Sequence, residues 1–545
     1  MLRRRIPAER LVTQDLAREL TALSRDIRRQ VGVLLDRRGA VTYVMVGDAH
    51  SIDLPDWGRL RAGRGRLRGL RCIHTHLGNE GLSRDDVTDL ALLRLDAMVS
   101  IASLEDGLPG MAHTASLRPP GRTDQPDEPD DGTLRLAPAS PSQLDFDFQA
   151  WIRDLEDELA RSLASQEVAD GERAILVSVT AGRSASEHEI HLEEFRELAR
   201  SAGVGVAKVL TQNRPRVDPK TVVGQGKLRD LVIQAFQTDV DLVIFDQDLT
   251  PTQARNLASR MELRVIDRTQ LILDIFAQNA SSRDGKLQVE LAQQKYRLPH
   301  LAQRQDVSLS RLAGGIGGRG PGEARLEVDR RRVRNRITRL EKELRKLGVQ
   351  RAGRRQRRNR RATPVLSIVG YTNAGKSSLL RALTHSDVHI ENKMFATLDP
   401  VSRRLRFPRE REVIVTDTVG FIRDLPPDLV TAFKATLEEL EDSSALIHVV
   451  DAAAPDASRH IETVRGLLDG LGLADTPELL VFNQIDRLPP GQGEALAHRE
   501  GGVAVSATEG QGLTELLSSV EQMLWREGLP PYEMARIAGM GKEEG

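Results

Sequence analysis

The sequence contains a single cysteine, Cys72, among 545 residues. One thiol cannot build a disulfide framework, so the class of disulfide-stapled secreted domains is excluded and a reducing compartment is favoured. No run approaches the roughly 18 consecutive apolar residues of a membrane-spanning helix. The N-terminal MLRRRIPAERL is basic but has no apolar core behind it, which argues against a secretory signal. These absences predict a cytoplasmic protein with no membrane span.

The length and the changing composition of the chain indicate several domains. Alternating strand-like and helix-like segments predict a parallel α/β domain in the middle of the chain, and a proline-, aspartate- and serine-rich segment before it is too polar to bury a core. We therefore expect a multidomain α/β fold. Its predicted parts are an N-terminal mixed α/β extension (1–117), a disordered linker (118–146), a parallel α/β domain (147–280), a basic helical hairpin with a glycine-rich loop (281–361), a P-loop domain (362–527) and a tail (528–545).

A glycine-rich stretch, GYTNAGKS, begins at Gly370, between an apolar run and the helix-compatible SLLRALTH. It matches G-x-x-x-x-G-K-[ST] in the strand–loop–helix setting of a phosphate-binding loop. Gly370 and Gly375 let backbone N–H groups face a phosphate chain. Lys376 reaches the β- and γ-phosphates, and the Ser377 hydroxyl is placed to bind Mg²⁺. The nucleotide contacts expected in this loop are Gly370, Tyr371, Thr372, Asn373, Ala374, Gly375, Lys376, Ser377 and Ser378.

Two further segments follow in the order that a nucleotide switch requires. Asp417 ends the apolar strand EVIVTD, where its carboxylate can hold Mg²⁺, and Gly420 offers a backbone N–H to the γ-phosphate. Thr397, in FATLDP, is the expected switch residue that closes on Mg²⁺ when a γ-phosphate is present. The expected Mg²⁺ ligands are Ser377, Thr397 and Asp417. Lys376, Thr397 and Gly420 are expected to assist hydrolysis, and the other expected nucleotide contacts here are Phe395, Asp417, Thr418, Val419 and Gly420.

The sequence NQID, which follows the strand-like ELLVFN, predicts which base is bound. The Asp486 carboxylate accepts hydrogen bonds only, so it can take both N1–H and N2–H₂ of guanine. Adenine presents an acceptor at N1, which would repel the Asp486 carboxylate and leave it without a hydrogen-bond donor. Ser506 and Ala507 complete the base-binding loop with Asn483 and Gln484. The four motifs together predict that this domain binds GTP and GDP with Mg²⁺.

The position after Gly420 is Phe421, where Ras-like switches place a glutamine that orients the attacking water. Phenylalanine has no polar group for that task. We therefore expect slow intrinsic hydrolysis that a macromolecular partner accelerates. Turnover above roughly 1 s⁻¹ without a partner would contradict this expectation, because unassisted Ras is about 10³-fold slower.

The segment from Arg330 to Arg361 carries sixteen Lys and Arg residues against two acidic ones. A solvated helix face is one explanation, but so large an imbalance is typical of a protein that binds a polyanion, and we favour RNA. Few aromatic residues are interleaved, so contacts to phosphates and to RNA shape fit better than base stacking.

The P-loop GYTNAGKSS, the switch segment FATLDP, DTVGFIRDLP, the upstream GGIGGRGPGE and VIDRTQLILDIFAQ together resemble the HflX family of bacterial GTPases over about residues 173–525. The resemblance implies binding to the large ribosomal subunit and ribosome splitting or recycling, with GTP hydrolysis driving release. An alternative is an RNA-binding ribosome assembly or remodelling GTPase that does not split ribosomes. We expect a monomer. The RNA-binding residues that the resemblance and the basic segment imply are Gly314, Gly315, Gly317, Arg319, Gly322, Arg331, Arg332 and Arg334.

Some features depart from that family or lie outside its core. Gln484 stands where Lys is more common, which removes a stacking cation but keeps the Asp486 contact. An N-terminal ATPase activity is attributed to the family, and Gly224 to Lys227 (GQGK) is the candidate here, although a lone GxGK is a weak signal and a tight turn before a helix is the favoured interpretation. Residues 1–165 lie outside the core resemblance.

His74, His76, Ser83 and Asp86 resemble the HxH…SxxD constellation of JAMM-type zinc hydrolases. Two histidines and an aspartate are a reasonable zinc set. The spacing between His76 and Ser83 is one residue short of that pattern, Leu77 replaces the usual proline, and no convincing catalytic glutamate precedes the motif. A metal-free pair of structural histidines and a zinc site both remain open from the sequence.

Overall fold

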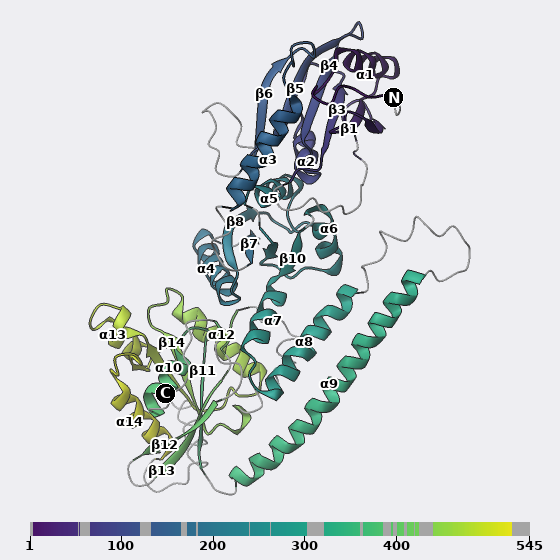
Figure 1. Cartoon of the computed structure of the whole chain (residues 1–545). Coiled ribbons are helices and arrows are strands. Elements are labelled where there is room, and N and C mark those ends of the chain that lie inside the picture. The colour runs from purple at the N-terminus through teal and green to yellow at the C-terminus, as the bar shows by residue number, and fades with distance from the viewer. Residues whose placement is uncertain are drawn as a thin grey trace. The chain divides into compact units, whose positions relative to one another are not determined.

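The computed structural model describes residues 4–52, 54, 66–119, 132–164, 172–180, 182, 184–238, 240–261, 263–301, 321–359, 363–384, 394–395, 401–407, 411–418, 420–423 and 440–525. The chain forms two compact units, Met1–Leu192 with Gly203–Asp267, and Glu193–Ala202 with Arg268–Gly545. In the first unit, helices pack on two sheets, and in the second they pack on a third sheet and form a long hairpin (Figure 1). None of the helices within these ranges combines the length and the apolar character needed to span a membrane.

The first sheet has the strand order β2-β1-β3-β4-β5-β6. Only β3 and β4 are parallel, and the other neighbours are antiparallel. A turn at Gly39, which has φ +77°, joins β1 to β2, and Ser83 caps α2 through a capping box with Asp86. The elements are α1 (Gln14–Ile27), β1 (Val31–Asp36), β2 (Val41–Val46), β3 (Leu70–His76), α2 (Arg84–Leu92), β4 (Ala97–Ser103), β5 (Pro109–Leu117) and β6 (Thr133–Ala139).

Two features correct the predicted boundaries of this region. The segment 118–146 was expected to be a disordered linker, but its residues 133–139 form β6, which pairs with β5. The helix α3 (Phe148–Ala164) was assigned to the domain 147–280, yet it packs on the first sheet. The Phe148 backbone N–H donates to the Glu9 carbonyl at 2.8 Å, and the Arg71 guanidinium lies 4.5 Å from the Phe148 ring centroid. The sequence shows an apolar stripe on this helix but not which sheet it covers.

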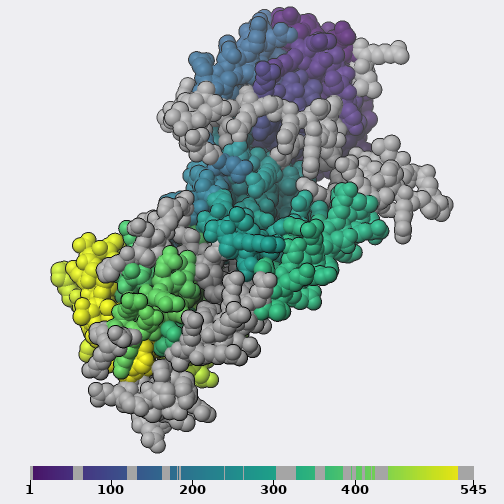
Figure 2. Space-filling view, turned by 60° about the horizontal axis from the view of Figure 1, so that its bottom comes forward, coloured from purple at the N-terminus to yellow at the C-terminus, as the bar shows by residue number. Residues whose placement is uncertain are grey.

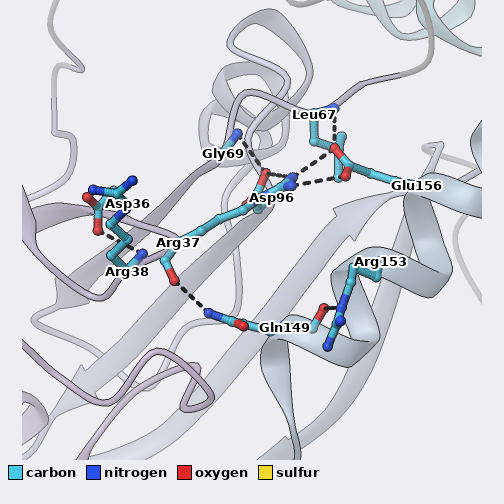
Figure 3. Close-up of polar contacts among 9 residues, drawn as sticks. All are labelled: Asp36, Arg37, Arg38, Leu67, Gly69, Asp96, Gln149, Arg153 and Glu156. Atoms are coloured by element: carbon cyan, nitrogen blue, oxygen red, sulfur yellow. Dashed lines mark hydrogen bonds and ion pairs between the residues drawn. The ribbon is translucent and has the colours of Figure 1, made fainter.

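Arg37 fixes α3 against the first sheet (Figure 3). Its guanidinium donates to Asp96 at 2.7 and 3.0 Å and to Glu156 of α3 at 2.9 and 2.8 Å. The Gln149 side chain adds a bond to the Arg37 carbonyl at 3.0 Å. Fork-shaped bidentate pairs of this kind fix orientation as well as contributing energy, so α3 belongs with the extension.

The second sheet is parallel, with the strand order β10-β9-β7-β8. Its strands alternate with helices along the chain, which confirms the alternation predicted from residue 173 onwards. The elements are β7 (Arg173–Thr180), α4 (Ala185–Ser201), β8 (Gly205–Asn213), α5 (Gln225–Thr238), β9 (Leu242–Phe245), α6 (Pro251–Met261) and β10 (Arg264–Asp267).

The second unit contains α7 (Arg268–Asn279) and the hairpin helices α8 (Arg283–Leu301) and α9 (Pro321–Asn359). The hairpin helices lie side by side (Figure 1), and two ion pairs join them, Arg336–Glu290 at 2.6 Å and Lys295–Glu341 at 3.0 Å. Leu340 of α9 is fully buried, as is typical of an apolar residue on the packed face of a helix. Figure 2 shows the teal and green surface of these helices open to solvent on the face in view.

The third sheet has the order β12-β13-β11-β14-β15-β16, in which only β12 is antiparallel to its neighbour. All six residues of β11 are buried, as expected of a central strand covered on both faces. Its elements are β11 (Val365–Gly370), α10 (Lys376–Thr384), β12 (Val401–Phe407), β13 (Arg411–Asp417), η2 (Leu440–Asp442), β14 (Ala445–Asp451), α12 (Ala457–Gly470), β15 (Glu478–Asn483), η3 (Ile485–Arg487), α13 (Gln492–Arg499), β16 (Val503–Ala504) and α14 (Leu513–Leu524).

Candidate functional site

The parallel strands of the third sheet bring three predicted motifs to one edge. β11, β13 and β15 end at Gly370, Asp417 and Asn483, and the chain continues from each into a motif loop. The carboxyl ends of parallel strands lie at the same edge of a sheet, where α/β proteins bind ligands. The tertiary structure therefore gathers motifs that are more than 100 residues apart in the chain.

Two glycines of the P-loop occupy positions that a side chain cannot share. Gly370 has φ +149°, and a Cβ there would lie 2.2 Å from the Val449 carbonyl oxygen. Gly375 has φ +85°, and its Cβ would lie 2.3 Å from Nδ2 of Asn483. Such positive φ values and close approaches favour glycine. The loop backbone is thereby held in the tight curve that a phosphate cradle needs.

Lys376 begins α10 and folds back over this loop. Its Nζ donates to the carbonyl oxygens of Gly370 at 3.1 Å and Tyr371 at 2.8 Å. Burial lowers the pKa of Lys376 to about 8, against an opposing effect of the Asp417 carboxylate. A positive charge that is shielded from water attracts a bound phosphate more strongly than a solvated charge does.

The residues expected to hold Mg²⁺ meet at the same place. The Ser377 hydroxyl donates to Oδ2 of Asp417 at 2.7 Å. A hydroxyl and a carboxylate are hard oxygen ligands of the kind that Mg²⁺ prefers, and one carboxylate is typical of a site completed by waters and phosphate oxygens. Both residues therefore fit the ion. The third expected ligand, Thr397, and the nucleotide contact Val419 lie outside the described residues.

Gly420 and Phe421 lie against the P-loop. A Cβ on Gly420 would come within 3.0 Å of Lys376 Nζ, so its backbone is close to the Lys376 ammonium. Phe421 is 3% exposed; its N–H donates to the Gly370 carbonyl at 3.1 Å, and its carbonyl accepts from Thr372 N at 2.7 Å. Its ring packs inward, which agrees with the expectation that Phe421 positions no water.

The base-binding loops are tied to the P-loop by side-chain amides. Asn483 donates to the Ala374 carbonyl at 2.9 Å and accepts from the Ala507 N–H at 3.1 Å. The Ser506 hydroxyl donates to Oδ1 of Asp486 at 2.6 Å and fixes the carboxylate that the sequence assigns to guanine. Gln484, the departure from the more common lysine, donates to the Asn373 carbonyl at 3.0 Å.

A buried polar cluster around Tyr371 was not found from the sequence. The Tyr371 hydroxyl donates to Glu194 at 2.7 Å and accepts from the Arg423 backbone N–H at 2.8 Å, and its ring stacks on His460 with centroids 3.9 Å apart. The guanidinium of Arg268 pairs with the same Glu194 carboxylate. These residues are far apart in the sequence, and no local motif signals their meeting. The cluster connects the P-loop and the segment after Phe421 to helix α4.

The remaining predicted residues have separate locations. Arg331, Arg332 and Arg334 are exposed on α9, and Arg332 pairs with Asp329 at 3.3 Å. Gly322 was assigned to the glycine-rich loop, but it lies in the first turn of α9, directly after Pro321, a residue favoured at that position. The other residues predicted in that loop lie outside the described ranges: Gly314, Gly315, Gly317 and Arg319.

The GQGK motif and the histidine pair both lie in the first unit. Gly224 precedes α5, and its N–H donates to Oε1 of Gln212 at 2.9 Å. Gly226 and Lys227 line a pocket of about 690 Å³. Gln225, Gly226 and Lys227 thus form the start of α5, directly after Gly224, and the pocket by itself does not identify a nucleotide. His74, His76 and Asp86 converge in the extension.

Known families match most of the chain beyond the extension. Models described as GTP-binding GTPase N-terminal, GTP-binding GTPase Middle Region and 50S ribosome-binding GTPase match residues 189–277, 279–358 and 365–484. The GTPase HflX of Caldanaerobacter subterraneus subsp. tengcongensis is 47% identical over 403 residues, which cover 72% of this chain and 90% of that protein. The chain belongs to the HflX family of GTPases.

The GTPase HflX of Escherichia coli strain K12 is 43% identical over 375 residues, covering 67% of this chain and 87% of that protein. Among solved structures, a GTP-binding protein from Sulfolobus solfataricus in complex with GDP is 23% identical and aligns with a TM-score of 0.37 over 67% of this chain and 99% of that one. This HflX-family member is a GTP hydrolase that binds GTP and GDP.

Proposed function

We propose that this GTPase binds the large ribosomal subunit through the α8–α9 hairpin and promotes the separation of ribosomal subunits, with GTP hydrolysis driving release. The observation that carries the proposal is the basic, exposed helix α9 in the compact unit that also holds the nucleotide site. Arg331 and Arg334 are exposed there, and neither forms an ion pair with another of the described residues. Arginines in this state are suited to contact RNA phosphates.

Membership of the HflX family and the match of residues 365–484 to a family described as 50S ribosome-binding GTPase support the same partner. The RNA of a ribosomal subunit is the polyanion that such a charged helix would meet. The exposed arginines would contribute affinity that depends on salt, because binding to phosphates releases counterions.

In the GTPase reaction, the P-loop backbone would hold the phosphate chain and Lys376 would neutralise charge on the β- and γ-phosphates. Ser377 and Asp417 would hold Mg²⁺, which supplies further neutralisation of the phosphate charge. Asp486 would select guanine. The Phe421 side chain has no polar group that could orient the attacking water. The bound ribosomal subunit is therefore expected to supply or position a group that does so.

Coupling between nucleotide and ribosome requires different affinities in the two nucleotide states. GTP would stabilise the bound, subunit-separating state, so the large subunit should bind more tightly with a non-hydrolysable GTP analogue than with GDP. Equal affinity in the two nucleotide states would contradict this coupling.

The first test measures GTP turnover with and without purified large ribosomal subunits at two salt concentrations. We expect strong stimulation that weakens at the higher salt. The double variant Arg331→Glu/Arg334→Glu should lose most of the stimulation while keeping the basal rate. Arg403→Glu, a reversal at an exposed arginine of β12, is the matched control and should keep it. Failure of wild-type subunits to stimulate turnover would refute the ribosomal partner and leave the GTPase assignment intact.

A second test separates splitting from assembly or remodelling. Intact ribosomes are incubated with the protein and a GTP analogue and are then resolved on a sucrose gradient. Conversion of intact ribosomes into subunits supports the proposal. Binding to large subunits without such conversion would favour the remodelling alternative.

A further inference from the structure

Two histidines and one aspartate of the extension point at a single place. His74 and His76 are two residues apart on β3, so their side chains project from the same face of the strand. Asp86 lies in the first turn of α2, where the Ser83 capping box fixes it. One ligand atom from each residue lies within 4.8 Å of the others. A strand and a helix N-terminus thus combine to make one cluster.

The separations within the cluster are those of atoms that share a metal ion. Nε2 of His74 lies 3.0 Å from Nε2 of His76, and these atoms lie 3.2 and 3.4 Å from the two carboxylate oxygens of Asp86. Ligands of tetrahedral Zn²⁺ bond at about 2.0–2.1 Å, which places neighbouring ligand atoms about 3.3 Å apart. Each of these three separations is within about 0.3 Å of that spacing, so small side-chain rotations would bring the two nitrogens and one carboxylate oxygen onto one face of such a tetrahedron.

The cluster is also closed to bulk water. His74, His76 and Asp86 are 0, 4 and 6% exposed. The Ser83 backbone N–H donates to Oδ2 of Asp86 at 2.7 Å, which restrains the carboxylate. Unpaired polar atoms are costly in such a place. If both imidazoles carried their proton on Nε2, two N–H groups would face each other at 3.0 Å. A dication satisfies both nitrogen lone pairs and the carboxylate together.

We propose that the N-terminal extension binds one divalent transition-metal ion of the Zn²⁺ type through Nε2 of His74, Nε2 of His76 and the Asp86 carboxylate. Imidazole and carboxylate are zinc ligands, and three protein ligands leave a fourth position for water or another ligand. Within the described ranges, no fourth His, Cys, Asp or Glu joins the group. The site is independent of the GTPase proposal, because all of its ligands lie in the other compact unit.

The test uses the full-length protein, purified through a tag without histidines, stripped with a chelator and kept in excess Mg²⁺ to saturate the Ser377 and Asp417 site. Zn²⁺ is titrated in competition with a chromophoric chelator, and Co²⁺ is titrated separately. We expect one Zn²⁺ per chain at submicromolar affinity and the strong visible absorption of tetrahedral Co²⁺. Absence of Zn²⁺ binding above the non-specific background, or only weak octahedral Co²⁺ absorption, overturns the proposal without recourse to any variant.

Variants then assign the ligands. His74→Ala, His76→Ala and Asp86→Asn should each weaken Zn²⁺ binding by about 100-fold or more, because even changes outside the ligand set of a metal site cost 10–100-fold. His113→Ala is the matched control: His113 is partly buried on β5, which is separated from β3 by β4, and it lies outside the triangle. It should bind Zn²⁺ as the wild type does. Circular dichroism confirms that each variant is folded, and equal loss in His113→Ala would show that the assigned ligand set is wrong.

Discussion

Replacing Tyr371 with phenylalanine removes one oxygen atom from the centre of the buried cluster and leaves the ring in place. The hydroxyl donates to Glu194 at 2.7 Å and accepts from the Arg423 N–H at 2.8 Å. Burial raises the pKa of Tyr371, and the Glu194 carboxylate raises it further, so the hydroxyl remains a donor throughout the neutral range. The ring can keep its stacking on His460.

The expected cost follows from the two lost hydrogen bonds. A hydrogen bond to a charged group contributes about 1.5–3 kcal/mol, and a buried N–H left without an acceptor costs about 1–3 kcal/mol. The two costs do not simply add, because the variant also avoids the free-energy cost of removing the tyrosine hydroxyl from water on folding. We therefore expect Tyr371→Phe to lower the free energy of unfolding of the second unit by about 2–4 kcal/mol. For a unit of this size that corresponds to a fall in Tm of about 3–7 °C.

Urea and thermal unfolding of the nucleotide-free protein measure this loss, with the second unit identified by its additional stabilisation when GDP is added. Tyr43→Phe makes the same chemical change on β2, where the side chain is 42% exposed and water replaces the lost contact; it should change stability by less than about 0.5 kcal/mol. If Tyr371→Phe is no more destabilising than Tyr43→Phe, the cluster does not stabilise the fold and the reasoning fails.

Two further predictions concern the nucleotide site. The pKa of Lys376 is about 8 without nucleotide. Bound phosphates favour the ammonium, so affinity for a non-hydrolysable GTP analogue should be constant below about pH 7 and about tenfold weaker at pH 9, because protonation is linked to binding. Lys376→Ala controls for deprotonation of guanine itself, and a wild-type profile no steeper than that of this variant would contradict the prediction. Asp486→Asn exchanges an acceptor for a group that also donates, so guanine affinity should fall by about 10²-fold or more while xanthine nucleotides bind better. Competition binding of GDP against xanthosine diphosphate checks this, and an unchanged preference for GDP would refute the role of Asp486.

The sequence alone determined the chemistry of the nucleotide site. Gly370, Gly375, Lys376 and Ser377 were predicted because a phosphate cradle needs those residue types at that spacing. In the structure both glycines have positive φ, and the Ser377 hydroxyl donates to Asp417. The capping box of Ser83 and Asp86 is also formed within four residues. Interactions of this kind are local, so their pattern is written in consecutive residues.

Only the tertiary structure decided which distant segments meet. The apolar stripe of α3 is visible in the sequence, but the partner sheet was fixed by Arg37, which lies 119 residues away from Glu156. Likewise β6 pairs with β5 within a segment whose composition suggests a linker, because backbone hydrogen bonding to a neighbouring strand outweighs weak local propensity. The Tyr371 cluster and the triangle of His74, His76 and Asp86 depend on distances and burial. Those distances and that burial exist only once the chain has folded. Burial matters because an unpaired polar group costs free energy only when it is removed from water, so a hydrogen-bond partner is stabilising there.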